Sequence, residues 1–244
     1  MIWDLFLSSF LLSVVLTGIH AYLGREIIKR GIVFADLAVA QFSGVGMAFS
    51  LLFFHGEHLY LFSLLFGLLA SLLIALSQKI RDYSEAFVGL MYAFGFSLAV
   101  LLLSFSPHGM EELKKLTASD VLFVKLEEVL KTAVLYAFVG ALLYLRKGLK
   151  KPVSELSFFA LFSLTLASSV KLAGVLVVFV LLVGPALVSL LLNRGLAFAW
   201  AWGVCWSFLA VVFSFWLDFP TGYAIVFFQS LAGLGVFVFR LARS

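Results

Sequence analysis

The chain has 244 residues, of which 64% are hydrophobic and only 12% are charged, and its mean hydropathy is +1.15. This composition excludes a soluble globular domain and a disordered chain, because soluble domains carry about 25% charged residues. A single cysteine, Cys205, excludes a secreted scaffold held by disulfides. The apolar runs are continuous, which is typical of membrane helices and not of the alternating strands of a membrane β-barrel. We therefore expect an all-α polytopic membrane protein.

Nine hydrophobic segments follow one another along the chain, each close to the length of about 20 residues that crosses a bilayer as a helix. They cover residues 3–23, 31–54, 59–78, 86–106, 128–146, 154–170, 172–192, 195–217 and 221–239. The stretch 154–192 contains a single charged residue after its first turn, Lys171, and is either one long bent helix or two spans. The alternation of charge favours two spans. We expect one transmembrane domain over residues 1–244.

The basic residues divide unequally between the two sides of the predicted helices. With the N-terminus outside, the inner loops hold most of the 17 Lys and Arg residues: Arg25, Lys29, Arg30, Lys79, Arg81, Arg146, Lys147, Lys150, Lys151, Arg194, Arg240 and Arg243. The outer segments hold Lys114, Lys115, Lys125, Lys131 and Lys171. Cytoplasmic loops are enriched in Lys and Arg, so this division predicts an outer N-terminus and an inner C-terminus. It also explains the net charge of +4 without a nucleic-acid partner.

One connecting segment is too polar to cross the membrane. Pro107 ends the fourth apolar run, and the sequence that follows, with EELKKL and VLFVKLEEVL, is amphipathic. This pattern predicts an interfacial or re-entrant helix near residues 108–127, on the outer face. A plain solvated loop is the alternative.

Two carboxylates lie inside predicted spans, where ionisable groups are costly and usually face the interior of a bundle. Each begins a series of small residues at steps of four, a spacing that lets helix backbones approach closely. The two series are Asp36, Ala40, Gly44 and Ala48, and Glu85, Gly89, Ala93 and Ser97. The functional interpretation is a cation pathway lined by acids. The alternative is that both acids form ion pairs with Arg30, Arg81 or Lys79 at the inner interface.

The four histidines are scattered and give a weaker signal. His108 lies four residues before Glu112, with Glu111 between them, so one helical turn would place an imidazole and carboxylates together as ligands for a divalent metal. A solvated loop is the alternative interpretation. The sequence HGEH at residues 55–58 is expected to form a turn, and His20 is expected to be a packed histidine.

Four segments resemble the zinc/manganese permeases of metal-ion ABC transporters. KRGIVFADLAVAQFSGVG resembles their second helix, SEAFVGLMYAF the acidic start of the fourth, SVKLAGVLVVFVLLVGPALVS a run that ends in Pro-Ala, and LDFPTGYAIVF the loop before the last helix. TASDVLFV fits the stretch before the fifth helix more loosely. These segments occur in the order found in the family, over nearly the whole chain.

The resemblance implies a homodimeric permease in the inner membrane of a prokaryote, with a separate cytoplasmic ATP-binding subunit and an external metal-binding protein. It implies alternating access and Zn²⁺ or Mn²⁺ as the transported substrate, with no permanently bound cofactor. Asp36 and Glu85 correspond to acidic positions of the family. The family's histidine one turn after the aspartate is Ala40 here, with Gln41 beside it. His108 with Glu111 or Glu112 is a candidate replacement.

Two further groups of residues receive predicted roles. Gly44, Gly46, Gly89 and Gly174 are expected to permit close helix packing. The resemblance implies docking on the ATPase through a cytoplasmic segment that is shortened here to RKGLKKPVSE. Either this short segment suffices, with Lys147, Lys150, Lys151 and Pro152 as the coupling residues, or the loops REIIKR and QKIRDY contribute. This short segment keeps a second function open, an ATP-independent metal or small-solute carrier or channel on the same scaffold. No nucleotide-binding P-loop and no nucleophile–base pair is evident, so we do not expect an enzyme.

Overall fold

The computed structural model describes residues 2–105, 111 and 121–243, and in this part of the chain every regular element is helical. The helices are α1 (Ile2–Arg30), α2 (Ala35–Phe53), α3 (Leu59–Ser77), α4 (Ser84–Leu103), α6 (Leu126–Leu145), α7 (Lys151–Ala173), α8 (Val175–Leu191), α9 (Leu196–Leu217) and α10 (Thr221–Leu241). Short 3-10 turns are η1 (Arg81–Tyr83), η2 (Val121–Phe123) and η3 (Arg146–Gly148). Within the described residues, eight helices are long and apolar enough to span a membrane, and α8 is a shorter apolar helix. The predicted all-α polytopic membrane fold is confirmed.

The ambiguous stretch 154–192 forms two helices, α7 and α8. They are separated by Gly174, whose φ of +81° belongs to the left-handed region that side chains with a Cβ rarely adopt. The break lies three residues beyond Lys171, where the sequence predicted it. The turn predicted at residues 55–58 is also present, with His55 and His58 at positive φ. Most of the predicted interfacial helix near 108–127 lies outside the described residues, and α6 begins at Leu126.

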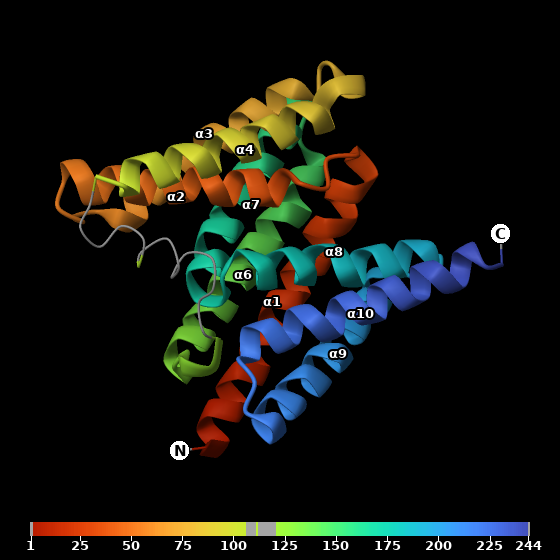
Figure 1. The fold of residues 1–244 in the computed structure, drawn as a ribbon. Coiled ribbons are helices and arrows are strands. Elements are labelled where there is room, and N and C mark those ends of the chain that lie inside the picture. The colour runs from red at the N-terminus through yellow and green to blue at the C-terminus, as the bar shows by residue number, and fades with distance from the viewer. Residues whose placement is uncertain (1, 106–110, 112–120, 244) are drawn as a thin grey trace. The chain divides into compact units, whose positions relative to one another are not determined.

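The chain divides into two compact units, each considered separately. Unit 1 comprises Met1–Arg30, Ala118–Ala137 and Leu172–Ser244, and unit 2 comprises Gly31–Thr117 and Phe138–Lys171. In unit 1, α1 packs on α8 and α9, and α10 packs on the same two helices. In unit 2, α2 lies between α3 and α4, and the three helices run side by side (Figure 1). That all 244 residues act as one transmembrane domain stays a prediction.

Glycines allow the closest helix contacts in both units. A Cβ at Gly46 of α2 would overlap the backbone of Phe62 in α3, and a Cβ at Gly24 of α1 would overlap the carbonyl group of Leu182 in α8. A Cβ at Gly203 of α9 would lie 2.7 Å from Cγ of Pro185. Van der Waals packing, rather than the hydrophobic effect, joins helices in lipid, so these bare backbones fix where the helices meet.

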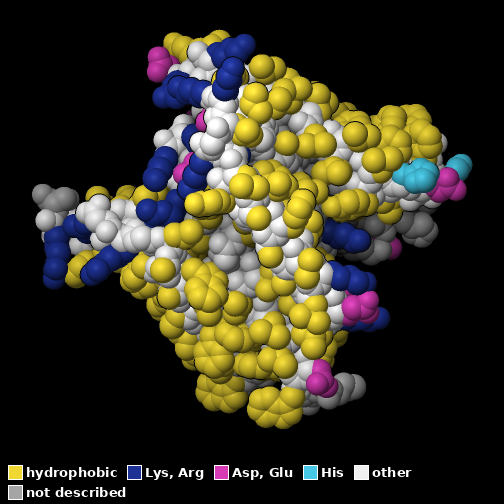
Figure 2. All heavy atoms as spheres, turned by 180° about the vertical axis from the view of Figure 1, so that it is seen from behind, with side chains coloured by type: hydrophobic (Ala, Val, Ile, Leu, Met, Phe, Trp, Pro, Cys, Tyr) yellow, Lys and Arg dark blue, Asp and Glu magenta, His cyan; other side chains and the backbone are white. Residues whose placement is uncertain are grey.

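The face drawn in Figure 2 is mostly apolar, with basic side chains gathered into clusters. Exposed leucine and phenylalanine side chains are numerous on α3, α4 and α10. On a membrane protein such a surface faces lipid, so its apolar character requires no protein partner.

Candidate functional site

Asp36 lies in the first turn of α2, where the positive end of the helix dipole favours a negative charge. Gly31, with φ +68°, begins the turn that leads into this helix. The Asp36 side chain is buried, since the residue is 2% exposed, and Oδ1 has no hydrogen-bond partner among the described residues. A buried carboxylate oxygen without a partner is unusual and costly, and therefore marks a candidate site.

Glu85 lies in the first turn of α4 and reaches the beginning of α2. Its Oε1 accepts a hydrogen bond from the backbone N–H of Phe34, the N-cap residue of α2, over 3.4 Å. Ser84, the first residue of α4, stabilises the turn between α3 and α4, because its hydroxyl donates to the carbonyl oxygens of Ser77 and Ile80. Glu85 Oε2 is buried and has no hydrogen-bond partner in the described part of the chain.

The two carboxylates are close enough to interact electrostatically. Within the described part of unit 2, neither forms an ion pair with Lys79 or Arg81. Arg30, in unit 1, pairs with Glu26 over 3.5 Å. Two neighbouring acids without a basic partner repel each other when both are ionised, so the arrangement favours a bound cation or proton.

The two predicted packing faces have different outcomes. On α2, all four residues of the predicted face (Asp36, Ala40, Gly44 and Ala48) are buried, as expected. On α4 the predicted face does not pack within the chain: Ala93 and Ser97 are exposed, and the buried series is Ser84, Val88, Met91, Gly95, Ala99 and Leu103. α4 approaches α2 through Gly95, where a Cβ would lie 3.1 Å from Cβ of Gln41 and 3.0 Å from Cδ2 of Phe42.

The predicted packing glycines also differ from one another. Gly46 occupies a close contact between α2 and α3, and Gly44 is buried on the same helix. A Cβ at Gly89 would meet nothing within 4 Å among the described residues, so no helix packs closely there. Gly174 lies at the break between α7 and α8, where its positive φ, rather than its small size, explains the glycine.

The histidines contribute no metal cluster in the described residues. His20 is buried in unit 1, with Nδ1 2.8 Å from the carbonyl oxygen of Leu16 and its ring edge-to-face with Tyr136. It is a packed histidine, as expected. His108 and Glu112 lie outside the described residues, and Glu111 is exposed. The outer ligand set predicted from these three residues stays a prediction.

The similarity to known sequences extends over nearly the whole chain. The ABC 3 transport family matches residues 3–151 and 146–240. The chain belongs to this family. As a member of the ABC 3 transport family it is a multi-pass protein of a prokaryotic inner membrane, and the resemblance to the permeases of metal-ion ABC transporters is confirmed.

Membrane proteins of bacterial metal-transport systems resemble the chain along most of its length. A protein of Haemophilus influenzae named "Probable iron transport system membrane protein" is 24% identical, over 97% of this chain and 90% of its own. The manganese transport system membrane protein MntC of Listeria monocytogenes is also 24% identical, over 96% of this chain and 90% of its own. The solved structure of PsaBC from Streptococcus pneumoniae in complex with Fab shares the fold, with a TM-score of 0.74, 18% identity and coverage of 94% of this chain and 90% of that one.

The connection between α6 and α7 is short in the structure. η3 and two further residues join the helices, and Lys147, Lys150, Lys151 and Pro152 are exposed. Arg146 is buried instead: its guanidinium lies 4.7 Å from the centre of the Phe158 ring and donates to the carbonyl oxygen of Ser154. The positive-inside pattern places Arg146 among the loop charges, and no local spacing predicts its contact with Phe158, because the extended Leu149 separates η3 from α7.

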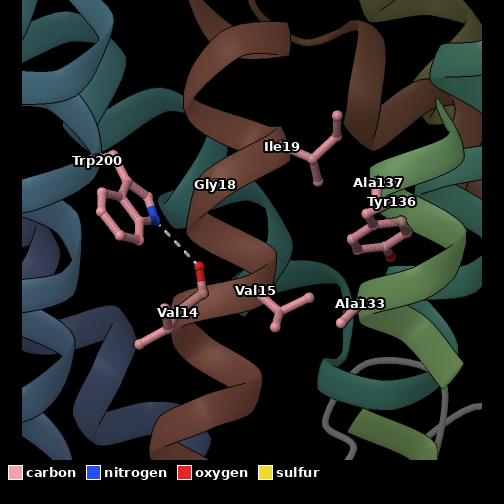
Figure 3. Close-up of a pocket in the computed structure, with 8 residues that line it drawn as sticks. All are labelled: Val14, Val15, Gly18, Ile19, Ala133, Tyr136, Ala137 and Trp200. Atoms are coloured by element: carbon pink, nitrogen blue, oxygen red, sulfur yellow. Dashed lines mark hydrogen bonds between the residues drawn. The ribbon is translucent and has the colours of Figure 1, made fainter. Parts of the chain in front are cut away.

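Unit 1 of this family member contains an apolar pocket of about 410 Å³, separate from the two acids (Figure 3). α1, α6 and α9 form it, with side chains Val14, Val15, Ile19, Ala133, Tyr136, Ala137 and Trp200, together with Gly18. The indole N–H of Trp200 donates to the carbonyl oxygen of Val14 over 3.3 Å. Its lining residues include no carboxylate, histidine or cysteine.

Proposed function

We propose that the chain is the membrane-spanning subunit of an ABC transporter that moves a divalent metal ion, Mn²⁺ or Zn²⁺. The observation that carries the proposal is the pair of carboxylates, Asp36 and Glu85, each with a buried oxygen that has no partner in the described residues. Relatives named for manganese and iron transport support a metal substrate.

The donor set favours Mn²⁺ over Zn²⁺. The position where the family carries a histidine is Ala40, and Gln41 beside it offers an amide oxygen. Carboxylate and carbonyl oxygens suit Mn²⁺, whereas imidazole suits Zn²⁺. In this proposal Asp36 and Glu85 hold the passing ion at the start of α2 and α4, and Gln41 lies one to two turns further along the path.

The energy would come from a separate ATP-binding subunit. The chain would act as a homodimer, receive the metal from an external binding protein, and alternate between outward-open and inward-open states with the N-terminus outside. Lys147, Lys150, Lys151 and Pro152 would face the ATPase, because they are exposed in the α6–α7 connection and the first turn of α7. Hydrolysis would take place on the partner, so the chain itself is a transport subunit and not an enzyme.

Metal uptake by the reconstituted transporter tests the role of the acids. The variants Asp36→Asn and Glu85→Gln are expected to lower Mn²⁺ uptake about tenfold or more, the usual consequence of removing a metal-binding group. The matched control is Glu127→Gln, which removes an exposed acid from the first turn of α6 and should leave uptake unchanged. Wild-type uptake by both site variants at every Mn²⁺ concentration would refute the proposal.

A second function, ATP-independent transport on the same scaffold, is favoured by the shortness of the α6–α7 connection. The two functions differ in what liposomes that contain only this chain can do. Mn²⁺ entry without the ATPase would support the carrier or channel. Uptake that requires both the ATPase and ATP would support the ABC permease.

A further inference from the structure

A groove with basic residues lies between the C-terminal ends of α8 and α10, in unit 1. Its volume is about 420 Å³, and its walls are Leu190, Leu191, Phe237, Arg240, Leu241 and Arg243. None of these residues belongs to the proposed metal path or to the proposed coupling segment. The groove therefore requires an explanation that goes beyond metal transport.

Arg240 is held in a defined position beside the groove. Its Nε and Nη2 both donate to the carbonyl oxygen of Leu191, over 3.1 and 2.6 Å, in the last turn of α8. The C-terminal end of a helix carries a partial negative charge, which favours a guanidinium there. Arginine has five N–H donors, so this contact leaves others for a ligand.

Arg243 adds a second positive charge on the same side of the groove. The central carbon of its guanidinium lies 4.1 Å from the centre of the Phe239 ring, a cation–π contact. The six wall residues include no acid. Two guanidinium groups without a carboxylate among the groove walls are complementary to an anion, and phosphate in particular matches their forked geometry.

The remaining walls are apolar and continue onto a surface that faces lipid. Leu190, Leu191, Phe237 and Leu241 form them. Along the same end of α10, Leu234 is 63% exposed and Val238 is 62% exposed, as expected for side chains in contact with acyl chains. A ligand that fills this groove would have an anionic head and an apolar tail.

We propose that the groove between α8 and α10 binds one anionic phospholipid, with its phosphate at Arg240 and Arg243 and its acyl chains along α10. Arginines at a helix end also serve as simple interfacial anchors, whose side chains extend to the headgroup level without selecting a lipid. The groove differs from that arrangement because Arg240 is fixed on Leu191 and the apolar walls provide a place for a tail. An acidic surface of a partner protein fits less well, since the groove opens onto the lipid-facing side of α10.

Native mass spectrometry of the full chain tests the proposal. The chain is released from nanodiscs that contain phosphatidylcholine alone or phosphatidylcholine with phosphatidylglycerol. The wild type is expected to retain phosphatidylglycerol in preference to phosphatidylcholine, and Arg240→Gln with Arg243→Gln should weaken that retention by about fivefold for each arginine removed. Lys29→Gln with Lys79→Gln removes the same charge from exposed sites and should retain phosphatidylglycerol as the wild type does.

Two further variants and one competitor separate the alternatives. Arg240→Lys with Arg243→Lys keeps both positive charges but loses the forked N–H donors of the guanidinium groups. This variant should therefore retain more phosphatidylglycerol than the double glutamine variant and less than the wild type. Such partial retention also excludes a folding defect. Equal retention by the wild type and the double glutamine variant would overturn the proposal. Displacement of the lipid by millimolar inorganic phosphate would do so as well, because the groove would then select phosphate alone. Loss of ATPase copurification with unchanged lipid retention would identify a protein-docking surface instead.

Discussion

At the scale of single residues, Glu85 has two separable roles on its two carboxylate oxygens. Oε1 accepts from the N–H of Phe34 and thereby caps α2, while Oε2 is buried without a partner in the described residues. An amide oxygen can replace the first role but carries no charge for the second. Glu85→Gln is therefore expected to keep the melting temperature near that of the wild type and to lose transport.

Glu85→Ala removes both roles and should also destabilise the protein by about 1 kcal/mol, the usual cost of a lost N-cap. Thermal unfolding in detergent measures the difference between the two variants. If Glu85→Gln and Glu85→Ala unfold at the same temperature, the capping role is contradicted, whatever their transport activities are.

Replacement of Asp36 is expected to change stability in the opposite direction from Glu85→Ala. Oδ1 of Asp36 is buried and unpaired in the described part of the chain, and such a carboxylate opposes folding unless a cation accompanies it. Asp36→Asn is therefore expected to raise the melting temperature without metal while it abolishes transport. Mn²⁺ should stabilise the wild type and have little effect on the variant, because a ligand stabilises only the state that binds it. A variant less stable than the wild type in the absence of metal would contradict this account of the site.

At the scale of helices, the glycines differ according to what faces them. Gly46→Ala would place a methyl group into the Phe62 backbone, and α2 and α3 would have to separate, at a cost on the order of 1–3 kcal/mol. Gly89→Ala meets open space among the described residues and should be neutral or slightly stabilising, since alanine favours the helix. Melting temperatures of the two variants, purified side by side, check the prediction. Equal losses would mean that the α2–α3 contact is not the cause.

The helices themselves could be predicted from the sequence, but not which face of α4 is buried. The length of each apolar run predicts a span, and the charged residues, glycines and prolines between the runs predict the turns. α7 and α8 separate close to the predicted position. In lipid both faces of a helix are apolar, so only small residues distinguish the packing face. α4 carries small residues on two faces. The spacing after Glu85 predicts packing through Gly89, whereas α4 contacts α2 through Gly95.

The candidate site was predicted in part for a related reason. Asp36 and Glu85 stand out because acids are rare in spans, and both lie at the starts of helices in the same unit. The hydrogen bond from Phe34 to Glu85 joins residues 51 positions apart, and no local pattern encodes it. The sequence does not predict the groove at Arg240. The positive-inside rule explains on which side of the membrane Arg240 and Arg243 lie, but it does not predict the contact of Arg240 with Leu191.

At the scale of the whole molecule, the arrangement of helices joins distant parts of the chain. α1 packs on α8 and α9, which follow it by more than a hundred residues, and the serine hydroxyl of Ser189 accepts from Arg25 over 2.5 Å. The hydropathy pattern of the sequence does not predict such contacts, because they depend on how the helices fit together in three dimensions. The same limit applies to contacts between copies of the chain, for which the sequence offers only the resemblance to homodimeric permeases.

We expect the homodimer proposed above to form through the exposed small residues on α4. Ala93 and Ser97 lie two and three turns beyond Glu85 on one face of α4, and both are exposed in the single chain. Small residues on an open helix face permit a close helix–helix contact, and a contact there would bring the acids of two copies near one path. Ala93→Cys, in a chain whose Cys205 is replaced by serine, is therefore expected to form a disulfide-linked dimer in native membranes under mild oxidation.

The control for this crosslink is Leu234→Cys in the same background. Leu234 is 63% exposed on the apolar side of α10, where we expect lipid rather than a second copy. Denaturing gels without reducing agent should show a band of twice the monomer mass for Ala93→Cys and little for Leu234→Cys. Because two cysteines form a disulfide only when their Cα atoms lie within about 7 Å, efficient crosslinking through Leu234 with none through Ala93 would move the dimer interface from α4 to α10. That result would also place a protein, rather than lipid, beside the groove at Arg240.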